Sequence, residues 1–173
     1  AMYARAVEIE PGFGGAWVNW GTCLAESGNM DDAEIMFLKA IECCPDVAPK
    51  AMMNLALVHQ TRANQLAMGG DLPAARDAIG QASKYLDDAK PLLDERLASM
   101  SGGGGGPGEK DAIRDLQSYA AKFRPLRLNV HKLAGQVFAG MRDFDSCITE
   151  FRRATESYPE EPGAWEMLAR VLE

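Results

Sequence analysis

The chain has 173 residues, of which 47% are hydrophobic and 25% are charged, as in a folded protein with a sizeable core. No apolar run approaches the roughly 18–20 residues that a membrane-spanning helix needs, so we expect a soluble chain. The net charge is −7, and residues 1–61 carry three basic against eight acidic side chains. This acidity argues against general binding of nucleic acid.

Cysteine and histidine are sparse, at Cys23, Cys43, Cys44, Cys147, His59 and His131. No CxxC pair is present, and a zinc site needs a tighter cluster of ligands. We therefore expect reduced, partly buried thiols in an intracellular protein, with no metal site and no cofactor.

In chain order, the first complete pattern describes two helices between residues 15 and 45. One helix is marked by Trp17, Trp20, Gly21 and Leu24, and the next, after a break at Gly28-Asn29-Met30, by Ala33, Phe37, Ala40 and Ile41. Pro45 ends the unit. These marks resemble the tetratricopeptide repeat, whose small residues let two helices approach closely while large ones fill the gaps. Because one such hairpin cannot bury its apolar face alone, neighbouring hairpins must stack.

The same marks recur at the period of this family. Ala6 and Pro11 precede Ala40 and Pro45 by 34 residues, and Ala120 and Pro125 precede Ala154 and Pro159 by the same 34. Trp165 then opens a unit at the position that Trp17 holds in its own. The resemblance implies an all-α fold, a right-handed α-α superhelix of stacked helical hairpins.

The predicted array is one domain with six segments. They are the end of a repeat at 1–11, a repeat at 14–47, an extended repeat at 49–89, a divergent repeat at 90–126 with a glycine-rich loop at 101–108, a repeat at 128–161 and the start of a repeat at 162–173. Since both ends cut a repeat, we expect the array to continue on both sides.

Two regions depart from the regular repeat. The turn at Gly69-Gly70-Asp71 comes seven residues late, which adds about 10 Å of helix and predicts a projecting hairpin. Pro91 suits the first turn of a helix and predicts a break near Lys90. The glycine run is expected to be mobile. It lacks the lysine spacing and the preceding strand of a phosphate-binding loop.

No catalytic constellation is evident, so we predict no enzyme activity, no catalytic residue and no small-molecule substrate. Neither histidine has a cysteine or serine at a spacing that indicates a nucleophile pair. The paired carboxylates at Asp31-Asp32 and Glu160-Glu161 fall at turns and helix starts, where they cap backbone N–H groups.

The resemblance implies a groove lined by the first helix of each repeat. Carried over by position, the predicted partner-binding residues are Val18, Asn19, Thr22, Lys50, Met53, Asn54, Leu57, Lys132 and Gln136. Asn19 and Asn54 match the family's groove asparagine, whose amide either holds a partner's backbone or contacts a neighbouring helix. Val18 and Thr22 cannot clamp a carboxylate, which argues against a role in binding chaperone tails.

A basic patch is predicted at Lys122, Arg124, Arg127 and Lys132. It could dock an acidic partner or RNA, or it could be a solvated face, which we favour. The leading function is a scaffold or adaptor that binds other proteins of a multisubunit complex. Two alternatives are the targeting arm of a larger enzyme, whose catalytic domain would lie outside this chain, and an RNA-binding helical repeat.

Overall fold

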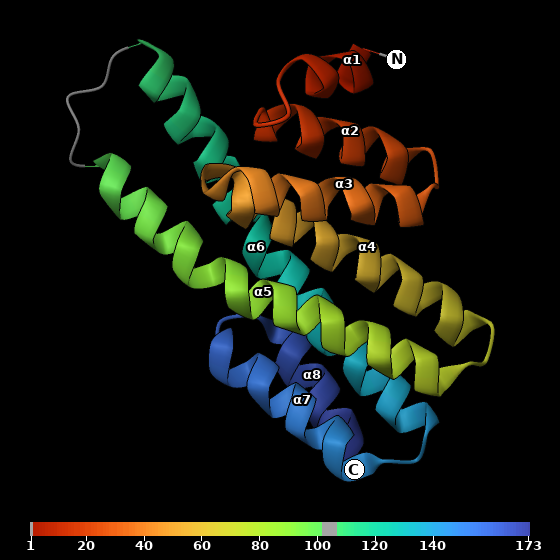
Figure 1. The fold of residues 1–173 in the computed structure, drawn as a ribbon. Coiled ribbons are helices and arrows are strands. Elements are labelled where there is room, and N and C mark those ends of the chain that lie inside the picture. The colour runs from red at the N-terminus through yellow and green to blue at the C-terminus, as the bar shows by residue number, and fades with distance from the viewer. Residues whose placement is uncertain (1, 102–106) are drawn as a thin grey trace. The chain divides into compact units, whose positions relative to one another are not determined.

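The computed structural model describes residues 2–101 and 107–173, and these residues form helices and no strand (Figure 1). The helices are α1 (Met2–Ile9), α2 (Gly14–Glu26), α3 (Met30–Cys43), the short 3-10 helix η1 (Pro45–Val47), α4 (Ala48–Met68), α5 (Leu72–Ser101), α6 (Pro107–Gly140), α7 (Phe144–Ser157) and α8 (Pro162–Leu172). The prediction of an all-α fold is confirmed. Of the glycine-rich loop predicted at 101–108, residues 102–106 lie outside the described residues, whereas Ser101 ends α5 and Pro107 begins α6.

Three helical hairpins, α2–α3, α4–α5 and α6–α7, share one type of turn. Each turn has a residue of positive φ (86°, 85° or 61°) followed by a capping residue: Gly28-Asn29, Gly70-Asp71 and Arg142-Asp143. The amide of each capping residue donates to the carbonyl five residues earlier, at 2.9–3.0 Å. Its side chain accepts a hydrogen bond from the amide three residues later. The turn thus satisfies both helix ends that it joins.

The two helices of a hairpin approach closely at a repeated pair of positions. Eight residues before the cap stand Gly21, Ala63 and Gly135, and eight residues after it stand Phe37, Ile79 and Phe151. A Cβ atom at Gly21 would lie 2.7 Å from the ring of Phe37, and one at Gly135 would lie 2.3 Å from the ring of Phe151. These two hairpins therefore need glycine opposite phenylalanine, and the sequence pattern had marked the first such pair, Gly21 and Phe37.

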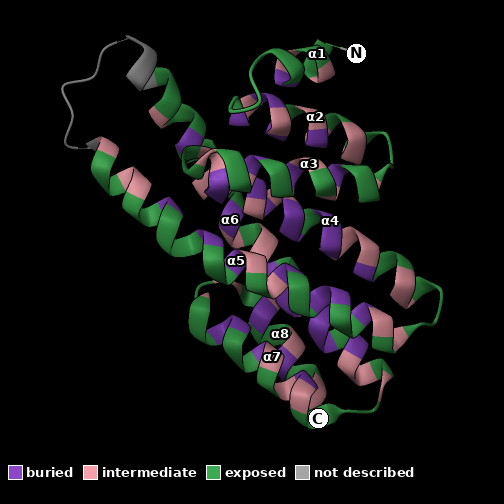
Figure 2. Cartoon of the chain, in the orientation of Figure 1, coloured by how far each residue is buried: buried purple, intermediate pink, exposed green. Residues whose placement is uncertain are grey.

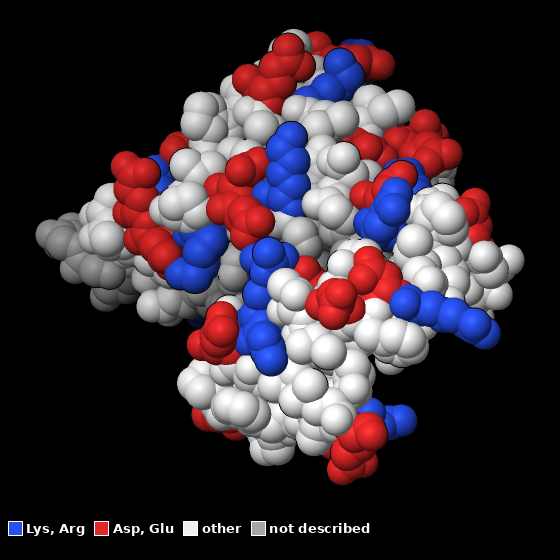
Figure 3. All heavy atoms as spheres, turned by 90° about the horizontal axis from the view of Figure 1, so that it is seen from below, with Lys and Arg blue, Asp and Glu red and all other residues white. Residues whose placement is uncertain are grey.

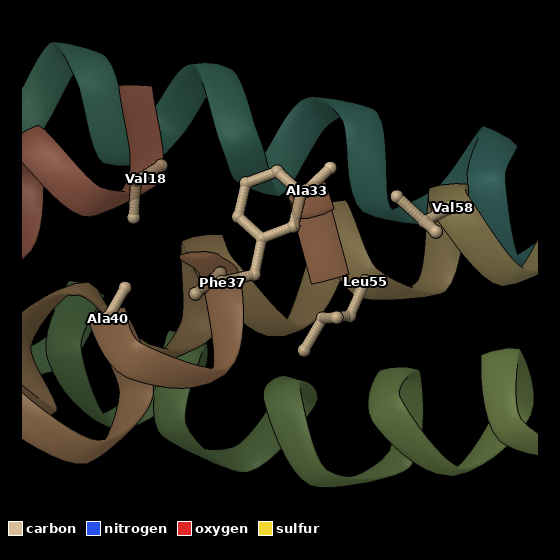
Figure 4. Close-up of a cluster of buried hydrophobic side chains, with 7 residues drawn as sticks. Val18, Ala33, Phe37, Ala40, Leu55 and Val58 are labelled. Carbon is tan, nitrogen blue, oxygen red and sulfur yellow. The ribbon is translucent and has the colours of Figure 1, made fainter. Parts of the chain in front are cut away.

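By contacts, the chain divides into two compact units, and the first contains Ala1–Val58 and Lys84–Phe123. In this unit α1 packs against α2, and α2 against α3. Its core contains Val18, Ala33, Phe37, Ala40, Ala51, Leu55 and Val58 (Figure 4). Tyr85 of α5 packs against the edge of this core, where burial raises the pKa of its hydroxyl.

The second unit contains His59–Ser83 and Arg124–Glu173. Its cores are formed by α6, α7 and α8, with Phe151 beside Cys147 and Leu168. The turn end of the α4–α5 hairpin belongs to the same unit. There the Arg127 guanidinium donates to the carbonyl of Ser83 at 3.2 Å, and Leu72 lies against Gly140. The prediction that this hairpin projects is therefore wrong, because α6 covers the added length.

Two prolines predicted to separate repeats lie inside continuous helices, Pro91 in α5 and Pro125 in α6. The helix break expected near Lys90 is absent, and the predicted boundaries at 89/90 and 126/128 fall within these helices. Both prolines are exposed, so each removes one helical hydrogen bond on a face that water can reach. The buried stripes continue past them at helical spacing, through Ile79, Ala82, Leu86, Ala89 and Leu93 in α5 and Leu116, Phe123, Val130 and Val137 in α6.

Helix α4 is the most enclosed of the long helices (Figure 2). Its exposed residues are Leu57, Asn64, Gln65 and Met68, all on one side. No helix within the described ranges is long and apolar enough to cross a membrane.

Candidate protein-interaction surface

The first helices of the hairpins present polar side chains at one repeated position. Counted from the capping residues, Thr22, Asn64 and Gln136 all stand seven residues earlier. Asn64 and Gln136 are exposed, and Thr22 is half-buried, with its hydroxyl donating to the carbonyl of Val18 at 2.9 Å. Because the turn and the core are the same in each hairpin, these three positions occupy the same side of their first helices.

Helix α8 carries a fourth example of this position. The Trp165 indole N–H donates to the carbonyl of Pro159 at 2.9 Å, as the Trp17 indole N–H does to the carbonyl of Pro11 at 2.9 Å. The two tryptophans therefore stand at equivalent positions, as predicted. Five residues after Trp17 is Thr22, so the equivalent residue of α8 is Arg170, which is exposed. Sequence reasoning missed Arg170, although the tryptophan spacing identifies it.

In the first unit, two of the predicted groove residues are part of the core. Val18 is 4% exposed and Met53 is 3% exposed, so neither can contact a partner. Both were predicted to bind a partner, and the structure places them in the core instead. Asn19 is exposed and Leu57 is 51% exposed, so both remain available.

Lys50 contacts α6 within the first unit, and Asn54 is half-buried one turn later on α4. The Lys50 ammonium pairs with Asp115 and lies 5.1 Å from the ring centre of Tyr119, and burial lowers its pKa. The amide nitrogen of Asn54 is buried and has no hydrogen-bond partner among the described residues. Lys50 thus joins α4 to α6.

The length of α4 explains why the predicted groove residues of this helix do not stand at the groove positions of the other first helices. The sequence comparison counted forward from the start of the helix, whereas counting back from the cap at Asp71 places Thr61 and Asn64 at the repeat positions of Asn19 and Thr22. The two countings differ by seven residues, or about two turns of helix. Sequence reasoning therefore missed Thr61 and Asn64.

In the second unit, Lys132 is half-buried and Gln136 is exposed. The Lys132 ammonium lies near Gly163 at the start of α8. Gln136 lies at the rim of a pocket with a volume of about 240 Å³. Its lining comes from α6, α7 and α8: Gly135, Gln136, Ala139, Phe151, Met167, Arg170 and Val171.

Most side chains of the predicted basic patch form ion pairs, hydrogen bonds or ring contacts with residues of their own unit. In the first unit, the Lys122 ammonium lies 5.3 Å from the ring centre of Tyr119. In the second unit, Arg124 pairs with Glu160 and stacks on Tyr158 at 5.1 Å. Basic and acidic side chains are interspersed on the face shown in Figure 3. Such pairing weakens any single positive field.

Arg127 belongs to a buried polar network between α6 and α7. Its Nε–H donates to Nε2 of His131 at 3.2 Å, which leaves Nδ1–H of His131 to donate to Glu150 at 2.9 Å. Burial tends to raise the pKa of Glu150, but the hydrogen bonds from His131 and Arg153 and the positive charge of Arg153 outweigh it and lower that pKa. His131 is 4% exposed, which fits a structural histidine.

Candidate metal ligands do not cluster in the part of the chain that the structure describes: no group of three His, Cys, Asp or Glu side chains could hold an ion there. His59 is 5% exposed and, like His131, stands at the repeat position of Trp17. Both histidines are thus buried at this repeat position.

The turn, the paired small and large residues and the tryptophan contact define a helical-hairpin repeat protein. Residues 132–173 match the family model described as Tetratricopeptide repeat. Residues 132–173 thus carry the tetratricopeptide repeat that the sequence marks indicated. It is also similar to a chain in the crystal structure of the APC/C hetero-tetramer Cut9-Hcn1, with 17% identity and a TM-score of 0.32 over 99% of this chain and 38% of that chain. The chain thus spans 38% of that chain's length. The comparison with curated proteins gives no match.

Proposed function

We propose that this chain is a scaffold that binds other proteins of a multisubunit complex through the exposed faces of its first helices. The observation that carries the proposal is the repeated exposure of polar side chains at one repeat position, at Asn64 and Gln136, together with exposed Asn19 in α2. Amide side chains both donate and accept hydrogen bonds, so they can pair with the backbone of an extended segment. Exposed Leu57 adds apolar contact on the same side of α4.

The proposal is tested by affinity capture with the intact chain and two triple variants. The first, Asn19→Ala, Thr22→Ala and Asn64→Ala, removes polar groups from the first helices. The matched control, Glu42→Ala, Lys84→Ala and Arg152→Ala, changes exposed residues of α3, α5 and α7. Both should keep the helix content of the original chain, because every position is on the surface or half-buried.

We expect proteins captured by the original chain to be lost with the first variant and kept with the control. Purified partners should then show the same order of affinities by calorimetry. If both variants capture the same proteins as the original chain, binding does not use the first helices and the proposal fails.

A further inference from the structure

The pocket between α6, α7 and α8 lies at two equivalent first-helix positions, Gln136 and Arg170. Both side chains stand at the repeat position of Thr22, so the pocket opens on the side that we propose to bind partners. This placement follows from the tryptophan and turn registers.

The walls of the pocket are apolar. The ring of Phe151 packs at Gly135, where no side chain can stand, and Ala139, Met167 and Val171 complete the lining. A volume of about 240 Å³ is below the roughly 300–1,000 Å³ of sites for drug-sized molecules. The pocket therefore has the dimensions for one apolar side chain of a partner.

The rim carries a cation, Arg170, that is not part of any ion pair between described residues. Arg170 forms no ion pair with any described residue, including Glu166 one turn earlier on α8, whereas Arg124 and Arg153 of the same unit pair with Glu160 and Glu150. Gln136, opposite, forms no hydrogen bond through its side chain within the described part of the unit. An exposed guanidinium beside an apolar pocket is suited to a carboxylate, which it can bind through two parallel hydrogen bonds.

We propose that this pocket receives an apolar side chain from an acidic segment of a partner protein, whose carboxylate binds Arg170. The proposal rests on the proposed scaffold function and narrows it to a chemical class of partner. The apolar side chain supplies contact area in the pocket, while the carboxylate next to it fixes direction and selects against basic segments.

The probe is a capped peptide, acetyl-Gly-Asp-Glu-Leu-Asp-Glu-Gly-amide, titrated into the ¹⁵N-labelled full chain. Two matched peptides replace the central leucine by serine or all four acidic residues by lysine. On the protein, Arg170→Glu reverses the rim charge and Ala139→Leu fills the pocket. Arg152→Glu, at an exposed arginine of α7 outside the pocket, makes the same charge change as a control.

We expect saturable shifts at the amides of Gly135, Ala139 and Val171 with the leucine peptide. Arg170→Glu and Ala139→Leu should each weaken binding at least tenfold, equivalent to about 1.4 kcal/mol, while Arg152→Glu changes it less than about twofold. The serine and lysine peptides should also bind at least tenfold more weakly than the leucine peptide.

Three results would overturn the proposal. They are no shifts at the pocket with the leucine peptide, equal weakening by Arg170→Glu and Arg152→Glu, or pocket shifts that grow with protein concentration alone, which would mean that a second copy fills the pocket. The capture variant Asn19→Ala, Thr22→Ala, Asn64→Ala leaves the pocket intact. If it loses partners while the peptide fails to bind, the scaffold function stands and only the pocket proposal fails.

Discussion

The fit between Gly135 of α6 and Phe151 of α7 makes a quantitative prediction for Gly135→Ala. The new Cβ would lie 2.3 Å from Cζ and 2.4 Å from Cε1 of the ring. Phe151 is 4% exposed, and Cys147 and Leu168 pack beside its ring in the core, so the ring cannot move away from the new Cβ without disturbing this packing. Overpacking of this kind costs about 1–3 kcal/mol, while replacing glycine by alanine inside a helix stabilises by about 0.5–1 kcal/mol. We expect the free energy of unfolding to fall by about 1–2 kcal/mol.

The α4–α5 hairpin indicates how this loss can be recovered. It has Ala63 and Ile79 at the equivalent positions, 0% and 6% exposed. Phe151→Ile alone should leave a cavity beside Gly135 and cost about 1–2 kcal/mol. Combined with Gly135→Ala it installs the alanine–isoleucine pair in α6–α7, so the new Cβ fills the space that the ring vacates. We expect the double variant to lose less than the sum of the single losses, by about 1–2 kcal/mol.

The measurement is urea unfolding of the full chain, followed by circular dichroism, for the four proteins of the double-mutant cycle. Gly80→Ala is the control, because Gly80 is exposed in α5 and a Cβ there would meet nothing within 4 Å. It should stabilise by about 0.5–1 kcal/mol. If Gly135→Ala stabilises as Gly80→Ala does, or if the two losses in α6–α7 simply add, the argument from close helix contact is refuted.

Three further predictions concern the second unit. Trp165→Phe removes the indole hydrogen bond to the backbone and should lower the free energy of unfolding by about 0.5–1.5 kcal/mol in urea titrations; no change would show that the bond contributes nothing. The lowered pKa of Glu150 contributes stability above its unfolded value of 4.5, and this is lost as the pH falls through the folded value. Glu150→Gln should therefore flatten the fall of the urea midpoint between about pH 6 and pH 3, and an unchanged slope would contradict the assignment. Cys147, which is 0% exposed and whose pKa burial raises, should resist N-ethylmaleimide while exposed Cys23 reacts, as mass spectrometry can show; equal rates would mean that this core opens readily.

The marks that identified the repeat are those whose physical role is local. Gly21 and Phe37 are separated by one hairpin turn, and the pair recurs at Gly135 and Phe151. The spacing along the chain is therefore enough to predict the contact. The same holds for Trp165, whose hydrogen bond spans six residues of chain. Such features can be predicted because few alternative structures satisfy them.

The predictions that failed depended on what covers a helix. Pro91 ends an isolated helix by the local rule, yet α5 continues because its buried stripe runs from Ile79 to Leu93 and the proline faces water. The register of the groove residues on α4 failed for a related reason. The added seven residues can be accommodated before or after the groove positions, and the repeated core pair, Ala63 and Ile79, decides between the two.

The sequence by itself therefore determined the class of fold, the hairpin turns and the glycine–phenylalanine pairs of α2–α3 and α6–α7, because these follow from residue spacing along one or two helices. Only the tertiary structure decided where α5 and α6 end, that Lys50 pairs with Asp115, and that Gln136 and Arg170 share one pocket. These features depend on contacts between residues more than 30 positions apart. Packing of the whole unit selects among such contacts, and local spacing does not distinguish them.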